Sequence, residues 1–334
     1  MKALIRKLTP ESLLVLKRVL FETYSLIVCT WYDFRQYATY SSTYNTASQE
    51  RMLGKVVLYY HVLEKGLSFE NSRSGFGVQV LENLIDTVNK YVELRYDTEQ
   101  LQFKTACSVI QKYFDVNTNT TGRVEELKGK LNHNLSQLCQ VDLGGTRTVT
   151  KSEILKAVDL DFKQFFNARH SIREFSDQEV DKQLILDAID IAKKYPSVCN
   201  RQAIRTYLIA SKGKVMEHLS YQNGNRGFRD KIDKVIVVTA DLSVFSKAEE
   251  RNQPFIDGGI YLMGLLLSLH SQGLGAVALN WSTHKKSDQA YRKLGTIKES
   301  EVIISFVGIG HLKEKITVPK SERNSIKDTL MVIE

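Results

Sequence analysis

The feature that most limits how this chain can fold is a change in its apolar pattern near residue 150. Before that point, apolar residues recur at helical spacing among charged ones, as in RMLGKVVLYYHVLEK at 51–65. After it, short β-branched runs such as KVIVVTAD at 234–241 alternate with helical stretches. The pattern predicts an all-helical region over residues 1–150 and a layered domain with a buried central sheet over residues 151–334.

The same spacing predicts the individual elements. Helices are expected in the first region over residues 11–31, 48–65, 76–95, 98–114 and 122–138. In the second region we expect helices over 177–195, 213–221, 254–272 and 286–294, and strands over 205–211, 234–241, 276–281 and 301–310. The stretch QVDLGGTRTVT at 140–150 combines a Gly-Gly pair with threonines, which is typical of a domain edge.

Composition narrows the class of protein. The chain has 334 residues, of which 43% are hydrophobic and 25% charged, which is typical of an ordinary globular protein and excludes disorder as the default. A net charge of +8 permits an acidic partner, but the absence of a Lys/Arg block favours a phosphorylated small molecule over nucleic acid. The widely spaced cysteines form no C-x-x-C pair, so we expect no metal site and no disulfide framework.

Two apolar stretches invite comparison with membrane segments. Charged residues interrupt the stretch near the N-terminus, so it is not expected to be a leader or a span. The stretch DGGIYLMGLLLSLHSQGLG at 257–275 is shorter than a typical span and contains Asp257 and His270. We therefore expect no membrane span, a cytoplasmic location, and a helix buried in the core or in a dimer interface.

Two glycines are expected to end helices. Gly66, in YHVLEKGLSFENSRSGFG at 60–77, fits the C′ position of a Schellman motif with Leu67 packing behind it. Gly273, in QGLGAV, fits a helix C-cap that leads through a tight turn into a strand.

The segment NARHSIREFSD at 167–177 gathers cationic residues ahead of an expected helix. On extended backbone, Arg169, Ser171 and Arg173 would face one side together. Guanidinium groups bind phosphate through bidentate, charge-assisted hydrogen bonds, so the segment could be a pocket for an anion. The other interpretation is a set of solvated charges before a helix capped by Ser176 or Asp177.

Four stretches of the second region together resemble the FMN-dependent nitroreductase family. They are ARHSIREF (168–175), PSVCNRQ (196–202), QGLGAVALNW (272–281) and VGIGHLKEKITVPKSERN (307–324). The resemblance covers roughly residues 162–334 and implies an α+β fold, a three-layer α/β/α domain with a central, mostly antiparallel sheet. The helical region before it would be an extension, of a kind that accompanies some nitroreductase-like proteins encoded near surface-polysaccharide genes.

The resemblance also implies roles for residues of the first two stretches. Arg169 and Ser171 would approach the FMN phosphate and ribityl chain, and Arg173 would lie near flavin N1 and the C2 carbonyl. His170 falls where the family often places a histidine against the cofactor, although a contact with backbone alone explains it equally well. The turn residues that would approach the flavin across a dimer interface are Ser197, Asn200 and Gln202. The family's usual proline after that glutamine is Ala203 here, which predicts a less stiff turn.

Further roles fall on the later stretches. Asn225 would contact the flavin amide, or would simply form part of a Gly/Asn-rich turn. Backbone N–H groups of Asn280 and Trp281 would reach flavin N5 and O4, and the indole of Trp281 would cover the ring or pack in the core. Lys320 and Arg323 would join Arg169 in clamping the phosphate. Two residues separate them where the commoner family form has one, so either could make the main contact.

The activity implied by the resemblance is that of an FMN-dependent NAD(P)H oxidoreductase. NADH or NADPH would deliver a hydride to flavin N5, and an electron-poor nitro, quinone or enone-like compound would then accept it. Because the flavin carries the chemistry, no catalytic side chain is expected. A homodimer with FMN at its interface is also implied, built partly on the 254–272 helix. The alternatives are a flavin-binding relative with dehalogenating or flavin-fragmenting chemistry, and a non-enzymatic scaffold on a degenerate fold.

Overall fold

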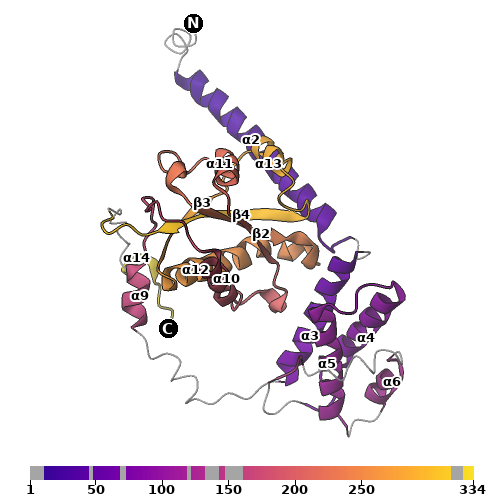
Figure 1. Ribbon diagram of the computed structural model, residues 1–334. Helices are drawn as coiled ribbons and strands as arrows, with labels where there is room; N and C mark the ends of the chain where they lie inside the picture. Colours follow the sequence, from indigo (N-terminus) through magenta and orange to yellow (C-terminus); the bar gives the residue numbers. More distant parts are fainter. Residues whose placement is uncertain are drawn as a thin grey trace.

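The computed structural model describes residues 11–44, 48–67, 73–118, 122–131, 143–146, 161–316 and 326–334. It has a helical part and a part built around a sheet (Figure 1). The domain boundary expected at residue 150 lies outside the described residues. The helix expected over 122–138 is shorter than expected, because it ends at Gly129 with Lys130 as its C-cap.

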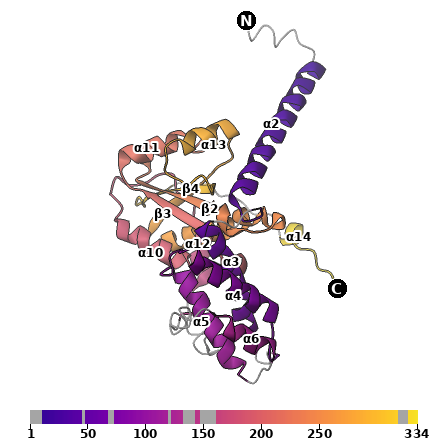
Figure 2. The same ribbon diagram turned by 90° about the vertical axis from the view of Figure 1, so that its right-hand side faces the viewer.

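Among the described residues, the helical part has five helices, each of which overlaps a helix expected from the sequence. They are α2 (Glu11–Tyr40), α3 (Gln49–Leu67), α4 (Val78–Glu93), α5 (Leu101–Val116) and α6 (Arg123–Gly129). Helices α3 to α6 share a core of their own in which Leu63, Leu84 and Tyr113 are fully buried. Helix α2 runs on to Tyr40 rather than ending near residue 31, because the residues between include no glycine or proline that would stop it. It projects from the rest of the chain (Figure 2).

The sheet has four strands, each of which lies where the sequence predicts it. They are β1 (Ile204–Ile209), β2 (Lys234–Asp241), β3 (Leu274–Asn280) and β4 (Glu301–His311). Their order is β1-β2-β4-β3, and every neighbouring pair is antiparallel. Central strand β2 is buried along its whole length, which explains its continuous apolar run. Strand β3 lies at one edge of the sheet and β1 at the other.

Helices cover both faces of this sheet (Figure 1), so the expected three-layer α+β architecture is confirmed. Helices α10 (Lys182–Ala192) and α12 (Gln253–Ser271) pack on the face that carries Ile236 and Val238. Helices α11 (Lys212–Ser220) and α13 (Lys285–Arg292) cover the face that carries Val235 and Val237. This alternation along β2 is the two-residue period of a strand buried on both faces.

The start of α10 differs from the expectation. The helix begins at Lys182, and its N-cap is Asp181, whose carboxylate accepts a hydrogen bond from the Gln183 N–H at 2.9 Å. The expected caps, Ser176 and Asp177, are therefore wrong. The Ser176 N–H donates instead to the carbonyl of His311 at 2.9 Å, which ties that residue to the end of β4.

Two short helices were not expected. Helix α9 (Phe162–Ala168) ends directly before Arg169, and α14 (Ile326–Thr329) lies near the end of the chain. Of the two glycines expected to end helices, Gly273 does so and Gly66 does not. Gly273 has φ +72° and follows the end of α12, as expected. Helix α3 continues through Gly66 to Leu67, so the expected Schellman stop is wrong; a Cβ on Gly66 would overlap the ring of Phe76.

Hydrogen bonds join the helical part to the sheet part. The Tyr32 hydroxyl donates to Asp288 Oδ2 at 2.8 Å, and the Tyr37 hydroxyl donates to the carbonyl of Lys247 at 2.6 Å. Ser42 donates through its backbone N–H to the carbonyl of Phe245 at 2.6 Å. Among the described helices, none is long and apolar enough to cross a bilayer.

Candidate functional site

The arginine-rich segment lies along the exposed edge of the sheet. Ser171 forms a parallel bridge with Ala276 of β3, and the Ile172 N–H donates to the Ala276 carbonyl at 3.0 Å. Ile172 is buried, whereas Ser171 is half-buried and Arg173 is exposed. The segment therefore has the extended, alternating form that the sequence predicts, with its apolar side against the sheet.

Arg169 lies in a cationic recess beside this edge. With His170 and His270 it lines a small cavity of about 50 Å³. The Nε of Arg169 is buried and has no hydrogen-bond partner among the residues that the structure describes. Burial lowers the pKa of His270, and the nearby charges of Arg169 and His170 lower it further. A buried guanidinium donor without an acceptor is costly, so the recess is suited to an anionic oxygen.

Arg173 extends this positive character along the β3 edge. Its guanidinium donates to the carbonyl of Ser171 at 3.4 Å, and no carboxylate among the described residues forms an ion pair with it. The neighbouring Glu174 pairs instead with Lys231 at 2.5 Å and with Lys313 at 3.1 Å. The Arg173 guanidinium is therefore available to contact a negatively charged group of a ligand.

At the far end of β3, a second group of polar residues forms a small network. The Asn225 amide donates to the carbonyls of Leu219 and Gln222, at 2.6 and 3.0 Å. The Gln222 amide donates to the carbonyl of Asn280 at 2.8 Å. Asn225 therefore stabilises a turn that Gln222 connects to β3. The sequence analysis did not single out Gln222, because a glutamine between a helix and a Gly/Asn-rich turn carries no distinctive signal.

Trp281 follows directly after β3 and is packed on three sides. Its ring stacks on Phe306 with centroids 5.0 Å apart and meets Tyr291 edge-on at 5.2 Å. Its indole N–H donates to Asp288 Oδ1 at 2.9 Å. The core-packing interpretation of this side chain is therefore the one that the structure shows.

The Ser197–Gln202 turn is strained. Cys199, Asn200 and Gln202 have φ angles of 48°, 51° and 50°, in the left-handed region that residues with a side chain rarely adopt. Each such residue costs on the order of 1–3 kcal/mol, so surrounding contacts must hold the turn. Within it, the Ser197 hydroxyl accepts a hydrogen bond from the Gln202 N–H at 3.1 Å.

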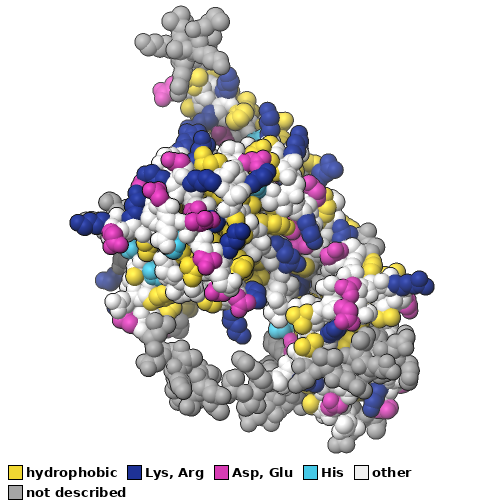
Figure 3. All heavy atoms as spheres, in the orientation of Figure 1, with side chains coloured by type: hydrophobic (Ala, Val, Ile, Leu, Met, Phe, Trp, Pro, Cys, Tyr) yellow, Lys and Arg dark blue, Asp and Glu magenta, His cyan; other side chains and the backbone are white. Residues whose placement is uncertain are grey.

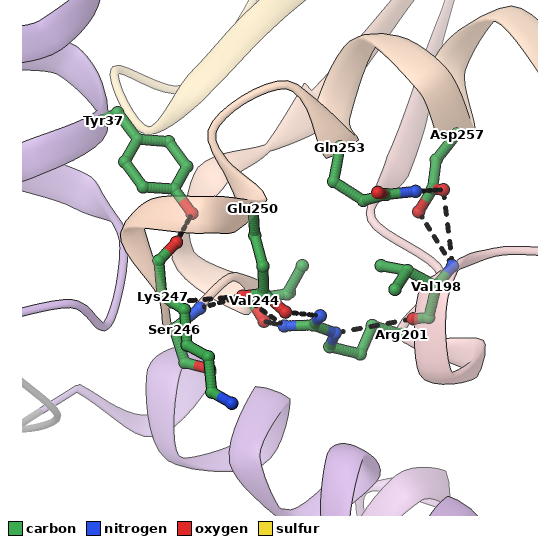
Figure 4. Close-up of polar contacts among 9 residues, drawn as sticks. All are labelled: Tyr37, Val198, Arg201, Val244, Ser246, Lys247, Glu250, Gln253 and Asp257. Carbon is green, nitrogen blue, oxygen red and sulfur yellow. Dashed lines mark hydrogen bonds and ion pairs between the residues drawn. The ribbon is translucent and has the colours of Figure 1, made fainter.

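Arg201 anchors this turn from inside the protein (Figure 4). Its side chain is fully buried and forms an ion pair with Glu250. It also donates to the Val244 carbonyl at 3.1 Å and lies over the ring of Phe245, 5.2 Å from its centroid. Burial raises the pKa of Glu250, but hydrogen bonds from Arg201 and the Ser246 N–H outweigh that effect and leave it below its ordinary value.

Asp257 is the second anchor of the turn (Figure 4). It is buried near the start of α12 and accepts hydrogen bonds from the Val198 N–H at 3.2 Å and from the Gln253 amide at 2.7 Å. Burial raises the pKa of this carboxyl. The turn is thus fixed by two buried side chains, although Ala203 replaces the proline that the family pattern would supply. Neither anchor was singled out from the sequence.

The predicted site residues fall into separate groups within one chain. Arg169, Ser171 and Arg173 lie beside β3, and Asn280 ends that strand, whereas the Ser197–Gln202 turn precedes β1 at the opposite edge of the sheet. Lys320 and Arg323, the expected phosphate clamp, lie outside the described residues.

The sequence model of the Nitroreductase family matches residues 167–221. This segment of the chain is thus similar to that family. The matched segment begins in α9 and ends just after α11, and it contains most of the residues for which a cofactor role is expected, namely Arg169, His170, Ser171, Arg173, Ser197, Asn200 and Gln202.

Several solved structures resemble parts of the chain at low sequence identity. A nitroreductase family protein from Streptococcus pneumoniae TIGR4 is 20% identical over 52% of this chain and 100% of that chain, with a TM-score of 0.45. A nitroreductase-like protein from Streptococcus mutans is 17% identical over 52% of this chain and 98% of that chain, with a TM-score of 0.45. An FMN-dependent nitroreductase from Clostridium difficile R20291 is 21% identical over 47% of this chain and 91% of that chain, with a TM-score of 0.40. No curated protein matches the chain.

Proposed function

We propose that the chain is an oxidoreductase that binds FMN along the β3 edge and transfers electrons from NADH or NADPH to an electron-poor organic acceptor. The observation that carries this proposal is the buried Arg169 Nε, which has no partner among the described residues and lies within the segment that matches the Nitroreductase family. A phosphate oxygen would supply the missing acceptor. The Arg169 guanidinium supplies the positive charge of the recess, and the lowered pKa of His270 favours a neutral imidazole that can donate or accept a hydrogen bond.

The residues beside β3 fit the other parts of the cofactor. Ser171 offers a half-buried hydroxyl next to Arg169, and Arg173 offers a cation without a carboxylate partner among the described residues. Such a cation would favour negative charge on a bound ring. FMN, when bound, supplies a ring that can accept and pass on two electrons. The chain's own residues bind it, orient it and set the charge around it.

A second copy of the chain would complete the site. Ser197, Asn200 and Gln202 lie at the β1 edge, on the opposite side of the sheet from the residues beside β3. A fixed, strained turn that presents polar side chains is suited to contact a ligand held by a partner subunit. The exposed apolar residues Ile256 and Ile260 of α12 would lie in that interface.

Absorbance spectra of the purified full-length protein, reconstituted with FMN, test the proposal. We expect a flavin spectrum that NADH or NADPH bleaches under anaerobic conditions, and that a nitroaromatic or quinone restores. Bound flavin that neither nicotinamide bleaches would point to the dehalogenating or flavin-fragmenting alternative. A protein with no affinity for FMN would refute the proposal and favour a scaffold role.

Arg169→Ala tests the phosphate assignment. Loss of a charge-assisted contact should weaken FMN binding by roughly tenfold or more, since such a bond contributes about 1.5–3 kcal/mol. The matched control is Lys182→Ala, which removes one exposed positive charge from α10. Fluorescence titration of FMN measures both dissociation constants, and equal affinities would remove Arg169 from the site.

A further inference from the structure

A cavity lies between α2 and the sheet part, away from the β3 edge. It consists of two adjoining spaces of about 170 and 570 Å³, whose walls share Asp33, Phe255 and Val302. We call the two together the α2 cavity. The larger space has the volume of a typical small-molecule site. The proposed function assigns no ligand to it.

The larger space is lined mainly by aromatic and apolar side chains. Five of them come from α2, the segment after it, the loop after β2 and the start of α12, and are Phe34, Tyr37, Tyr44, Leu242 and Phe255. The charged residues Glu249 and Arg251 also contribute to its wall. Flat aromatic walls favour a ligand with a planar aromatic body, which they can contact over its faces and edges.

The smaller space contains a hydrogen-bond chain that fixes the orientation of Gln36. The Gln36 Nε2 donates to the Tyr32 hydroxyl at 3.0 Å, and that hydroxyl donates to Asp288 Oδ2 at 2.8 Å. Because the Tyr32 hydroxyl donates its proton to the Asp288 carboxylate, it can only accept a hydrogen bond from Gln36. If the Gln36 amide were flipped, its Oε1 would face the Tyr32 oxygen with no hydrogen between them. The amide nitrogen must therefore face Tyr32.

This orientation leaves the Gln36 Oε1 without a donor. The residue is 8% exposed, and its Oε1 is buried and unpartnered. A buried acceptor without a hydrogen bond costs about 1–3 kcal/mol, so a ligand that brings an N–H or O–H group would gain from contacting it. Gln36 belongs to the cavity wall, so a ligand in the smaller space would lie next to the amide that carries this oxygen.

Two charged residues of the same wall define the ligand further. Asp33 forms no ion pair or hydrogen bond among the described contacts. The residue is exposed at the surface, but partial desolvation of its carboxyl and the charge of Asp288 raise its pKa. Lys285 places its Nζ 5.7 Å from the centroid of the Tyr32 ring. Arg292 already forms an ion pair with Asp288, with its Nε 2.7 Å from Oδ2. The available groups are thus two acceptors, Gln36 and Asp33, and one cationic donor, Lys285.

We propose that the α2 cavity binds a planar aromatic compound bearing a primary amide. The two N–H groups of such an amide match Gln36 Oε1 and Asp33, and its carbonyl oxygen matches Lys285. An aromatic carboxylate would place a negative charge beside Asp33 and leave Gln36 unsatisfied. An aromatic ketone would satisfy Lys285 alone. The inference rests on the cavity itself and does not depend on flavin binding.

Calorimetric titration of the full-length protein with 2-naphthamide tests this proposal. We expect saturable binding at one site per chain. The matched probes 2-acetylnaphthalene and 2-naphthoate keep the ring and carbonyl but lack the N–H groups, so each should bind about tenfold more weakly or worse. Absence of saturable binding by 2-naphthamide would overturn the proposal, as would equal binding of the ketone.

Two variants locate the binding within the chain. Gln36→Leu and Asp33→Ala should each weaken 2-naphthamide binding by about tenfold, whereas Glu22→Ala, elsewhere on the exposed surface of α2, should leave it unchanged. Thermal unfolding establishes that each variant is folded. Because Asp33 is exposed, Asp33→Ala should leave the fold intact. It therefore provides the test if the Gln36→Leu protein is unstable. Unchanged affinity in a folded Asp33→Ala protein would place the ligand elsewhere and overturn the proposal.

Discussion

Arg201 carries a positive charge into the interior and relies on Glu250 to balance it. Its side chain is fully buried, whereas that of Glu250 is 17% exposed. Burying both charges costs desolvation energy, which only good geometry and additional hydrogen bonds offset. The Val244 carbonyl and the Phe245 ring supply such contacts. Removing one partner is therefore far more damaging than removing an exposed ion pair.

We predict that Glu250→Gln lowers the free energy of unfolding by about 3–5 kcal/mol, because it leaves the Arg201 charge buried without its counter-ion. The control is Glu217→Gln, which breaks an exposed pair with Lys214 and should change stability little. Urea denaturation at neutral pH measures both variants. Equal effects would show that the buried pair contributes no more than an exposed one.

The lowered pKa of Glu250 also predicts a pH dependence. A carboxyl whose pKa is lower in the folded state than its ordinary 4.5 contributes stability that is present above that value. That contribution is lost as the pH falls through the folded-state pKa. Wild-type stability should therefore fall more steeply on acidification below 4.5 than that of Glu250→Gln, as measured by urea midpoints across the acid range. Parallel curves would contradict the assignment.

The role of a single residue could be predicted from the sequence only where its contacts lie nearby in the chain. The extended form of Arg169 to Arg173 follows from alternation within the segment itself. The anchors Arg201 and Asp257 could not be found in this way, because Glu250 lies 49 residues from Arg201 and Val198 lies 59 residues from Asp257. No local pattern records such pairings. The proposed cofactor contacts of Asn225, Asn280, Lys320 and Arg323 remain predictions.

At the scale of elements, the sequence predicted all four strands and most helices, because each buries a periodic apolar face. The failures occur where tertiary contacts decide. Ser176 would suit a helix cap, but its N–H bonds to His311 at the end of β4, so the helix starts later. Gly66 would suit a helix end, yet α3 passes through it, because the Phe76 ring occupies the space where a Cβ would lie.

Gly66→Ala should therefore destabilise the protein by about 1–3 kcal/mol, since the gain in helix propensity is smaller than the cost of displacing Phe76 from a packed core. The control is Gly129→Ala in α6, where a Cβ meets nothing within 4 Å and the change should stabilise by up to about 1 kcal/mol. Thermal and urea unfolding measure both variants. A stabilised Gly66→Ala protein would refute the packing argument.

For the whole molecule, the main question is what covers the apolar residues that one chain leaves exposed. Basic, acidic and apolar side chains are interspersed over the face seen in Figure 3. Large exposed apolar residues are numerous on α2 and α12. On α2 these include Phe21, Ile27 and Trp31, and on α12 they include Ile256 and Ile260. Exposed apolar surface of this extent is typical of an interface between chains.

If α12 forms the proposed dimer interface, Ile260→Glu should shift the protein from dimer to monomer, because it would bury a charge without a partner. FMN affinity should fall with it, since the Ser197–Gln202 turn of a second copy would no longer reach the site. Sedimentation velocity and FMN titration measure the two effects. Lys193→Glu, an exposed change near the end of α10, is the control. A dimer that survives Ile260→Glu would place the interface elsewhere.

The contacts of α2 also determine when it can fold during synthesis. Its partners Lys247 and Asp288 belong to the sheet part, and Asp288 lies 256 residues after Tyr32. At roughly 5–20 residues per second, a ribosome needs on the order of 10–50 s to make that interval. Among the described residues, the apolar core of α3 to α6 is formed by residues between 52 and 131, so much of it can form early. Through that interval the nascent chain carries an amphipathic helix without its docking surface, so α2 is the segment most suited to chaperone binding before release.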